Sequence, residues 1–281
     1  MAIGDSVRIN TNIAALNALS ALKSINRSLE KAQFKLATGL RINEVADDPA
    51  GFVISNRLRA RSMGLTTAFN NVGTSKNVLA IAEGGLMNIS DIIITIKEKV
   101  TQAASDTLGS AERNAIKTEI DQLTAEVDDI VNETLFNNIA LIDGTYTGIS
   151  IQTGEGTTNT LIMSISQDHS ANGLSLVSGS LSSRVFTATG ASVALSNVNT
   201  ALETLNNSLQ NIGATISRLT VKESTLSIAI TNTEATKSRI LDADIAKEQI
   251  QSTRLQILQQ TATAQLAQAN VSPQNVLALF T

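Results

Sequence analysis

The sequence contains no cysteine, no tryptophan, two prolines, one tyrosine and one histidine. Without cysteine the chain forms no disulfide bond, and its redox compartment is not constrained. Aromatic residues make up 2% of the 281 residues, so the apolar content is mainly leucine, isoleucine, valine and alanine. This composition suits long helices packed side by side better than a thick globular core.

Charge is also sparse, with a net charge of −4 at pH 7. Basic residues do not interleave with aromatic ones, so we expect no nucleic-acid binding. No apolar run reaches the ~18 residues that a membrane-spanning helix needs, and we expect no membrane insertion. The first residues lack the basic segment and apolar core of a secretory signal peptide, so any export is expected to use another route.

Residues that carry catalysis or bind cofactors are scarce as well. The single histidine, His169, cannot form the two-histidine zinc motif HExxH, and nothing in the sequence assembles a Ser-His-Asp triad around it. We therefore interpret His169 as an exposed loop residue. Asp47 and Asp48 could form a metal site or cap a helix that begins at Pro49, and the cap is the favoured interpretation. We predict no enzyme activity, no cofactor and no metal.

What the sequence does contain is a long apolar heptad. From Ile54 to Val100, apolar residues follow in alternating steps of four and three, interrupted only by Arg61 and Ser75. Such a stripe is the seam of a coiled coil and requires a partner helix. At 1.5 Å per residue it extends over about 70 Å. The predicted seam includes Ile54, Leu58, Leu65, Val72, Leu79, Leu86, Ile89, Ile93, Ile96 and Val100.

Two further heptads supply partner helices. One covers residues 195–230, and the other, which is shorter, covers residues 116–130. Three helices of matching period predict a slender antiparallel bundle. The seam positions that we assign to the longer of these two heptads are Leu202, Leu209 and Ile216.

Residues 138–191 lose the helical period and are rich in glycine, serine and threonine. Alternating polarity on either side of Gly154 and Gly156 predicts one or two β-hairpins. We expect this region to project outward at one end of the bundle. We also expect the chain to reverse its direction there.

The two ends of the chain are uncharged, since residues 9–22 and 255–281 hold no Asp, Glu, Lys or Arg. A helix without charge on any face is normally surrounded by protein. Glutamine and asparagine make these ends too polar for lipid. We therefore expect the ends to pair and to become ordered when neighbouring copies surround them. The assembly positions are Ile13, Leu22, Leu29, Leu255, Leu266, Val276 and Leu277.

The sequence thus predicts a mainly α fold. It is a long antiparallel coiled-coil helical bundle, shaped as a rod, with a small β-hairpin region at one end and a terminal helix pair. The predicted divisions are an N-terminal helix with its linker, the first part of the rod, the outward β region, the second part of the rod and a C-terminal helix. They cover residues 1–42, 43–140, 141–191, 192–240 and 241–281.

Four segments resemble the terminal signatures of bacterial flagellins. Near the N-terminus they are INTNIAALNAL (residues 9–19) and LATGLRINEVADDPAGFVISNRLRARSMGL (residues 36–65). Near the C-terminus they are SRILDADIAKE (residues 238–248) and QILQQTATAQLAQANVSPQNVLALF (residues 256–280). The resemblance implies a structural subunit that polymerises into the extracellular flagellar filament.

In flagellins the two chain ends pair as a coiled coil that lines the inner tube of the filament, and the long helices surround it. The resemblance also implies export of the unfolded chain by the flagellar type III apparatus. It implies contacts with an export chaperone, the filament cap and the hook-junction proteins. A hook–filament junction protein of the same family is the alternative, and the intact C-terminal tail favours the filament subunit.

Some flagellins are bound by a vertebrate Toll-like receptor through an Arg and, four residues later, a Leu on the long helix, with a Glu on the next helix. Counted from the EGGL step at residues 83–86, the equivalent positions are Thr95, Lys99 and Glu119. The charge and planar fork of the Arg are absent, and an ammonium replaces the apolar contact. The resemblance therefore implies weak or no binding to this innate immune receptor.

Overall fold

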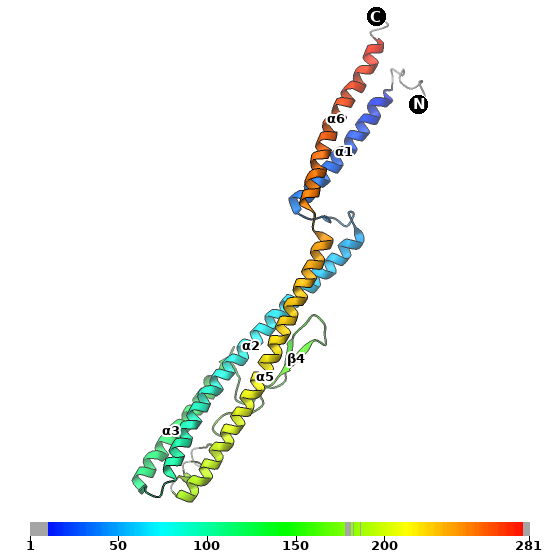
Figure 1. The fold of residues 1–281 in the computed structure, drawn as a ribbon. Helices are drawn as coiled ribbons and strands as arrows, with labels where there is room; N and C mark the ends of the chain where they lie inside the picture. Colours follow the sequence, from blue (N-terminus) through cyan, green and yellow to red (C-terminus); the bar gives the residue numbers. More distant parts are fainter. Residues whose placement is uncertain (1–10, 178–180, 182, 186, 278–281) are drawn as a thin grey trace. The chain divides into compact units, whose positions relative to one another are not determined.

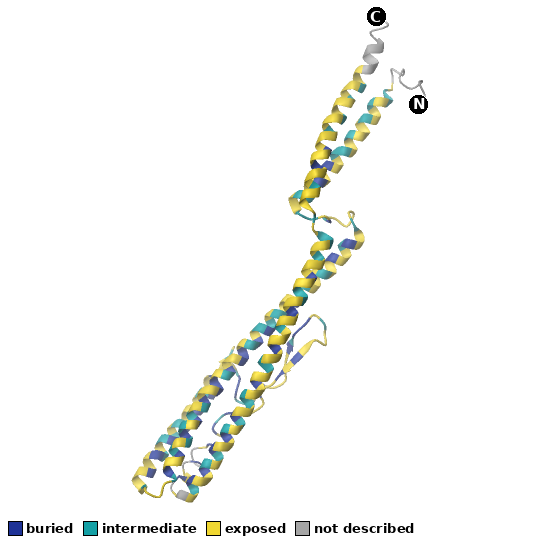
Figure 2. Cartoon of the chain, in the orientation of Figure 1, coloured by how far each residue is buried: buried dark blue, intermediate teal, exposed yellow. Residues whose placement is uncertain are grey.

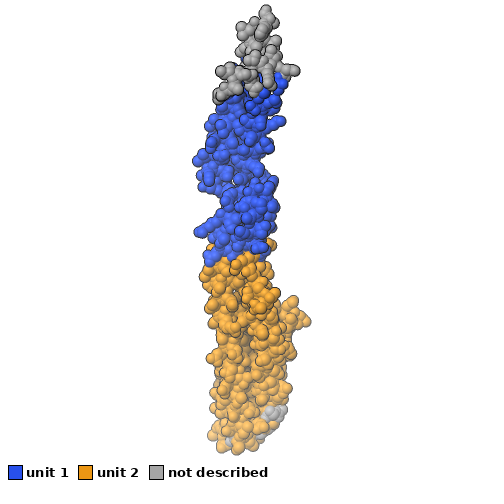
Figure 3. Space-filling view, turned by 90° about the vertical axis from the view of Figure 1, so that its right-hand side faces the viewer, with its two compact units in different colours: residues 1–60, 232–281 blue, residues 61–231 orange. Residues whose placement is uncertain are grey.

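The computed structural model describes residues 11–177, 181, 183–185 and 187–277 (Figure 1). Two compact units make up the chain, and Figure 3 draws them in different colours. The terminal unit is Met1–Ala60 with Asn232–Thr281, and the bundle unit is Arg61–Thr231. In chain order the elements are α1 (Ile13–Thr38), α2 (Pro49–Ala103), α3 (Ser110–Glu133), β1 (Leu135–Phe136), β2 (Ile139–Ala140), β3 (Ile149–Gln152), β4 (Thr160–Met163), α5 (Ala188–Leu241) and α6 (Ile245–Leu277).

In the terminal unit, α1 and α6 lie side by side (Figure 1). Helix α1 begins after Asn12, whose side-chain oxygen accepts a hydrogen bond from the N–H of Ala15 at 3.0 Å. It ends at Gly39, whose φ of 71° lets its N–H reach the carbonyl of Lys35. Glycine adopts this left-handed conformation without steric cost. The two boundaries therefore follow from local sequence.

Helix α2 begins as the sequence predicts. Asp48 accepts a hydrogen bond from the N–H of Gly51 at 2.9 Å, and Pro49 occupies the first helical position. An acidic N-cap and a proline at N1 both favour a helix start. The side chain of Asp48 is thus used by the helix, which supports the cap over a metal site.

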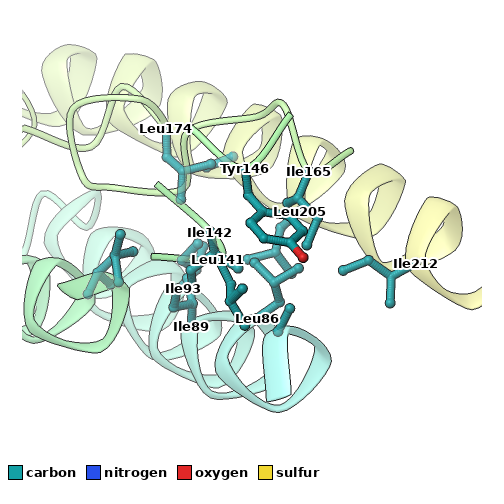
Figure 4. Close-up of a cluster of buried hydrophobic side chains, with 14 of the residues drawn as sticks. Leu86, Ile89, Ile93, Leu141, Ile142, Tyr146, Ile165, Leu174, Leu205 and Ile212 are labelled. Carbon is teal, nitrogen blue, oxygen red and sulfur yellow. The ribbon is translucent and has the colours of Figure 1, made fainter. Parts of the chain in front are cut away.

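In the bundle unit, α2, α3 and α5 surround one aliphatic core, and their buried positions repeat along one side of each helix (Figure 2). From Val72 to Val100 the predicted seam of α2 is buried. Figure 4 shows the middle of this core, with Leu86, Ile89 and Ile93 of α2, Leu205 and Ile212 of α5, and Leu141, Ile142, Tyr146, Ile165 and Leu174 of the connecting segment. The fold is mainly α, as predicted.

By length and composition alone, α2 is the one helix among the described residues that could cross a membrane. The core helix of a protein outside a membrane meets the same criteria. The apolar side of α2 packs against the other helices of the bundle unit. This packing accounts for its apolar content.

A buried arginine organises the turn from α2 into α3. Arg113 donates hydrogen bonds to the carbonyls of Ala103 at 2.6 Å and Ser105 at 2.8 Å, and a longer one to Val185 at 3.4 Å. The last carbonyls of a helix lack intrahelical partners and carry partial negative charge. Helix α2 has no basic residue in its own last turn. The guanidinium of Arg113 supplies the missing positive charge at the end of α2. It also fixes the segment that precedes α5.

Two small hairpins follow α3, in agreement with the predicted β region. Strands β1 and β2 pair around Asn137 and Asn138, which both have positive φ, as two-residue hairpin loops require. Strands β3 and β4 pair in an antiparallel register. Their alternate residues Ile151, Leu161 and Met163 are buried in the core of the bundle unit.

The β region differs from the prediction in two respects. The chain first reverses in the loop between α2 and α3, and the segment after α3 then returns it to the end where both α3 and α5 begin (Figure 1). The segment also projects outward less than predicted, because Leu141, Ile142, Leu176 and Leu181 are fully buried. The physical reason is that α3 ends at Glu133, so the connecting segment covers the rest of the apolar surface of the bundle unit.

The β3–β4 hairpin is held against α2. Its tip residue Glu155 forms an ion pair with Arg61 at 3.1 Å, and Asn71 donates a hydrogen bond to the carbonyl of Gln152 at 3.4 Å. Arg61 is one of the two interruptions of the predicted seam. The ion pair gives this interruption a structural role.

Candidate assembly surface

The α1–α6 pair buries little apolar surface. Its apolar cluster consists of Leu29 and Ala32 of α1 and Leu255 of α6, with Ile25 half-buried beside them. Burial of one large aliphatic side chain stabilises a fold by about 1.5–3 kcal/mol. The pair therefore gains far less from packing than the bundle unit does. Alanine, glutamine and threonine at the other facing positions explain the difference.

Amide side chains fix the register of the pair. Gln259 donates a hydrogen bond to the side-chain oxygen of Asn26 at 2.9 Å, and Asn12 donates one to the carbonyl of Ala269 at 2.7 Å. In the described part of α1 and α6, no ion pair joins the two helices. The polar contacts between the two helices are thus uncharged.

Most positions on the outer faces of the pair are exposed (Figure 2), and several of them carry large apolar side chains. Phe34 is 52% exposed, Ile250 71% and Ile257 59%. Ile250, Ile257 and Leu258 line an apolar groove of 410 Å³ along α6. Contiguous exposed apolar surface on a protein marks a site of interaction. This surface is suited to burial against other helices.

The segment between α1 and α2 is hydrogen-bonded to the segment between α5 and α6. The N–H of Arg41 donates to the carbonyl of Leu241 at 2.7 Å, and the N–H of Ala243 donates to that of Gly39 at 2.9 Å. The guanidinium of Arg41 adds a bond to the carbonyl of Ile240 at 2.6 Å. These bonds hold together the points where α1 ends and α6 is about to begin.

Asp47 also stabilises the segment between α1 and α2. It accepts hydrogen bonds from the N–H groups of Asn43 at 3.2 Å and Glu44 at 3.3 Å, and it lies 3.5 Å from the ammonium of Lys31. Desolvation acts to raise the pKa of Asp47, but the two backbone bonds and Lys31 outweigh it, so the pKa lies below its ordinary value. Among the described residues, no group of three or more acidic or histidine side chains is placed to hold a metal.

The predicted seam of α2 is buried from Leu65 onward and less so before it. Ile54 is 47% exposed, and Leu58 is half-buried. The helix α3 and the connecting segment that cover the later seam belong to the bundle unit, which begins at Arg61. At the second interruption, the hydroxyl of Ser75 donates to the carbonyl of its own helix at Asn71, at 2.7 Å.

The α5 seam residues that the sequence singled out are not the deepest ones. Leu202, Leu209 and Ile216 are half-buried against the core. The alternate positions of the same heptad are fully or almost fully buried, and they are Val198, Leu205, Ile212, Leu219 and Leu226. Heptad spacing identifies both sets, but the depth of each set depends on where α3 and the connecting segment lie.

The predicted assembly residues fall into three groups. Leu29 and Leu255 are buried in the pair, whereas Ile13, Leu22 and Leu266 are half-buried. The side chains of Val276 and Leu277 lie outside the described residues.

The prediction for His169 was wrong, because its side chain is fully buried. One ring nitrogen lies 3.1 Å from the carbonyl of Ile142, and the other lies 2.9 Å from the hydroxyl of Ser208 on α5. Burial lowers the pKa of His169, against the opposing effects of the Ile142 carbonyl and the neighbouring Asp168. No local signal in the sequence indicated this burial, since its partners are distant along the chain.

Comparisons with known proteins identify the family. The model of the bacterial flagellin N-terminal helical region matches residues 9–147. The model of the bacterial flagellin C-terminal helical region matches residues 195–280. The flagellin of Bacillus subtilis (strain 168) is 34% identical over 305 residues, covering 98% of this chain and 100% of the relative. This chain belongs to the bacterial flagellin family.

Other relatives agree with this flagellin assignment. The flagellar filament 33 kDa core protein of Treponema phagedenis is 32% identical over 289 residues and covers 97% of this chain and 99% of its own length. A solved structure described as a flagellar hook-associated protein from Vibrio parahaemolyticus has a TM-score of 0.60 at 14% identity, over 70% of this chain and 100% of that chain. The last likeness concerns the fold alone. Flagellins are structural subunits and not enzymes. As a member of this family, the chain is a structural subunit.

The positions that the sequence predicts to be equivalent to receptor contacts, Thr95, Lys99 and Glu119, lie on α2 and α3. The hydroxyl of Thr95 donates to the carbonyl of Asp91 at 3.0 Å. The ammonium of Lys99 lies 2.6 Å from a carboxylate oxygen of Glu119, and both side chains are partly exposed. The carboxylate of Glu119 is therefore paired within the chain.

Proposed function

We propose that this flagellin polymerises through its α1–α6 pair. The observation that carries the proposal is the imbalance of that pair, which among its described side chains buries three apolar residues but exposes Phe34, Ile250 and Ile257. Neighbouring copies would remove this apolar surface from water, at about 25 cal/mol per Å². The absence of charge from residues 255–281 means that such burial desolvates no ionised group there.

The proposal places the protein outside the cell, in the flagellar filament. We infer that the chain leaves the cell unfolded, through the flagellar type III apparatus. Family membership supports both inferences. The lack of cysteine is compatible with such a route, because no disulfide cross-links the chain before or during passage.

An export chaperone, the filament cap and the hook-junction proteins are the further partners that we infer from the family. The role of a hook–filament junction protein is not favoured. The relatives that match over nearly the whole chain are a flagellin and a filament core protein.

We also propose that binding to the flagellin-sensing Toll-like receptor is weak or absent. The ion pair between Lys99 and Glu119 supports this proposal. A receptor would have to break that pair before it could use the carboxylate. Thr95 offers no charge in place of the expected arginine.

The test compares the full chain with a variant that lacks residues 1–42 and 241–281. We expect the full chain to form long tubes in electron micrographs. The shortened chain keeps the bundle-unit core, so it should retain helical circular dichroism and stay monomeric in analytical ultracentrifugation. Filaments of normal appearance from the shortened chain would contradict the proposed role of the pair.

A further inference from the structure

An exposed stripe on α2 combines apolar and acidic side chains. Met87, Asp91, Ile94 and Glu98 follow at steps of four, three and four, which places them on one face of the helix. Met87 is 54% exposed and Ile94 is 53% exposed. We call these four residues the acidic stripe.

A matching stripe on α5 combines apolar and basic side chains. Val221 is 67% exposed and Ile228 is 61% exposed, and they are separated by the same seven residues as Met87 and Ile94. Arg218 and Lys222 are exposed beside them. We call Arg218, Val221, Lys222 and Ile228 the basic stripe.

The basic stripe includes a hollow into which a side chain fits. Val221, Arg218 and Lys222 line an apolar groove of 360 Å³ together with Ser217 and with Leu161 of β4. The groove lies where the β3–β4 hairpin meets α5. Its apolar lining and flanking positive charges suit an apolar side chain that has a carboxylate nearby.

Within the part of the chain that the structure describes, the charges of both stripes have no ion-pair partner. Of the ion pairs that the described residues form, none involves Asp91, Glu98, Arg218 or Lys222. Arg218 and Lys222 are four residues apart on one helix, where like charges disfavour each other. Carboxylates from another molecule would relieve this repulsion.

We propose that the acidic stripe of one copy of this flagellin docks on the basic stripe of the next copy. The proposal rests on the self-assembly proposed above and assigns a specific contact to it. With the two helices antiparallel, Met87 faces Ile228 and Ile94 faces Val221. This register brings the two carboxylates within one helical turn of the two basic side chains. In this one register, the apolar side chains of the two stripes face each other and the carboxylates lie near the basic side chains.

The antiparallel arrangement has a consequence for how copies are related. Helices α2 and α5 run in opposite directions within one copy (Figure 1). An antiparallel contact between α2 of one copy and α5 of the next therefore keeps both copies pointing the same way. Because the two stripes are different surfaces, the contact does not close into a dimer and continues from copy to copy.

The contact also sets an axial shift between neighbours. Within one copy, Lys76 of α2 and Glu223 of α5 form an ion pair at 2.7 Å and so lie at the same level. In the proposed register, Glu223 lies level with residue 92 of the neighbour. The difference of sixteen residues corresponds to a stagger of about 24 Å.

The register is tested by cysteine cross-linking, for which the chain offers a clean background because it has no cysteine. The variant carries Met87→Cys and Ile228→Cys. Within one copy these positions are separated axially by about 24 Å, whereas a disulfide needs Cα atoms within about 7 Å. Any disulfide therefore joins two copies. We expect oxidised filaments to give a ladder of covalent multimers on non-reducing gels.

The matched control carries Thr101→Cys with Ile228→Cys. Thr101 is exposed on the same face of α2, two heptads from Met87, and within one copy it is still farther along the axis from Ile228 than Met87 is. It should give dimers and a ladder at no more than background level. A ladder of equal intensity from the control, or filaments of the first variant without a ladder, would overturn the proposed register.

The charges are tested by reversal. One variant carries Asp91→Lys and Glu98→Lys, and the other carries Arg218→Glu and Lys222→Glu. Each alone presents like charges at the contact, and we expect it to lose polymerisation while its circular dichroism is unchanged. A 1:1 mixture restores opposite charges at every contact when the copies alternate, so we expect the mixture to form filaments.

A second control separates contact from net charge. Glu126→Lys with Asp129→Lys reverses two exposed charges on α3, outside both stripes. This control should polymerise alone. Loss of its polymerisation, or normal filaments from either stripe variant alone, would overturn the proposal while leaving self-assembly of the unmodified chain intact. Failure of the unmodified chain to polymerise would instead overturn the proposed function itself.

Discussion

At Gly85 the backbone of α2 lies against the segment that follows α3. A Cβ added at Gly85 would lie 2.6 Å from the hydroxyl of Thr134 and 3.3 Å from the terminal methyl of Ile142. At Gly84, by contrast, an added Cβ would have no atom within 4 Å. Two adjacent glycines that cost the helix equally are therefore not equivalent. Packing requires only Gly85.

We predict opposite effects for alanine at these two positions. Gly84→Ala should raise the free energy of unfolding by up to about 1 kcal/mol, because alanine favours the helix. Gly85→Ala has the same helix preference, but overpacking costs about 1–3 kcal/mol and should make it the less stable variant. Urea unfolding followed by circular dichroism measures both. Equal stabilisation by the two changes would show that the approach to Thr134 is not tight.

The second residue-scale feature is the pairing of His169. The carbonyl of Ile142 can only accept a hydrogen bond, so Nδ1 carries the proton in the neutral ring. Nε2 then accepts a hydrogen bond from the hydroxyl of Ser208 when that hydroxyl turns away from its other acceptor, the carbonyl of Thr204 at 3.1 Å. The neutral ring is satisfied on both sides. Protonation would place a positive charge in a buried site, next to Asp168 as its nearest carboxylate.

Acid should therefore destabilise the bundle unit through His169. Burial holds the folded pKa below the ordinary 6.5, so below that pH the unfolded chain binds the proton more readily. Stability from this group is complete above pH 6.5 and is lost as pH falls toward the folded pKa. The loss is at most about 1.4 kcal/mol per pH unit. Denaturant unfolding from pH 7.5 to 5 measures it, with His169→Gln as the control that lacks this titration. The same pH slope in both proteins would exclude His169 as its source.

At the scale of elements, the alternation of buried and exposed residues on α2 can be tested directly. Ile93 is fully buried, whereas its neighbour Ile94 is 53% exposed. Ile93→Asp places an unpaired charge in the core and should cost at least about 3 kcal/mol. Ile94→Asp should change the free energy of unfolding by no more than about 0.5 kcal/mol. Denaturant unfolding of the monomer measures the difference, and similar effects at both positions would refute the heptad register.

The heptads of α2, α3 and α5 could be predicted because each periodic apolar stripe needs a partner wherever that partner lies. The β3–β4 hairpin could be predicted because polarity alternates on either side of Gly154 and Gly156. The β1–β2 hairpin at Asn137 and Asn138 was not predicted. The exposure of Ile54 and the burial of His169 could not be predicted. Both depend on which distant segment covers a surface, and the local pattern does not contain that information. For the same reason the heptad of α5 could be predicted, but not which of its two sets of positions is the deeper one.

At the scale of the whole molecule, the two units differ in how much of their surface is already buried. The bundle unit has one continuous aliphatic core that folding completes within the chain. Among its described side chains, the α1–α6 pair has three buried apolar residues and several large exposed ones. The outer stripes of the bundle unit carry unpaired charges and apolar side chains. Assembly would thus bury the surfaces that folding leaves exposed. In the α1–α6 pair these are apolar side chains, and on the bundle unit they are the acidic and basic stripes.

Recognition by the flagellin-sensing receptor also depends on surface that the monomer leaves open. We predict weak activation by the unmodified monomer in a receptor-reporter assay, because each missing anchor costs about 2 kcal/mol or more, at least tenfold in affinity. Thr95→Arg with Lys99→Leu should raise activation. The arginine restores the charged fork, and the leucine restores an apolar contact while it also releases Glu119 from its 2.6 Å ion pair.

The single changes separate these contributions. Lys99→Leu alone should gain part of the activity, since it frees the carboxylate of Glu119. Lys117→Leu is the matched control, because it breaks a different ion pair, to Asp121 at 2.6 Å, on α3 alone. It should leave activation unchanged, since no receptor-equivalent residue takes part in that pair. Strong activation by the unmodified protein would contradict the prediction. No gain from the double change would show that the surface around Thr95 and Lys99 differs from that of activating flagellins at further positions.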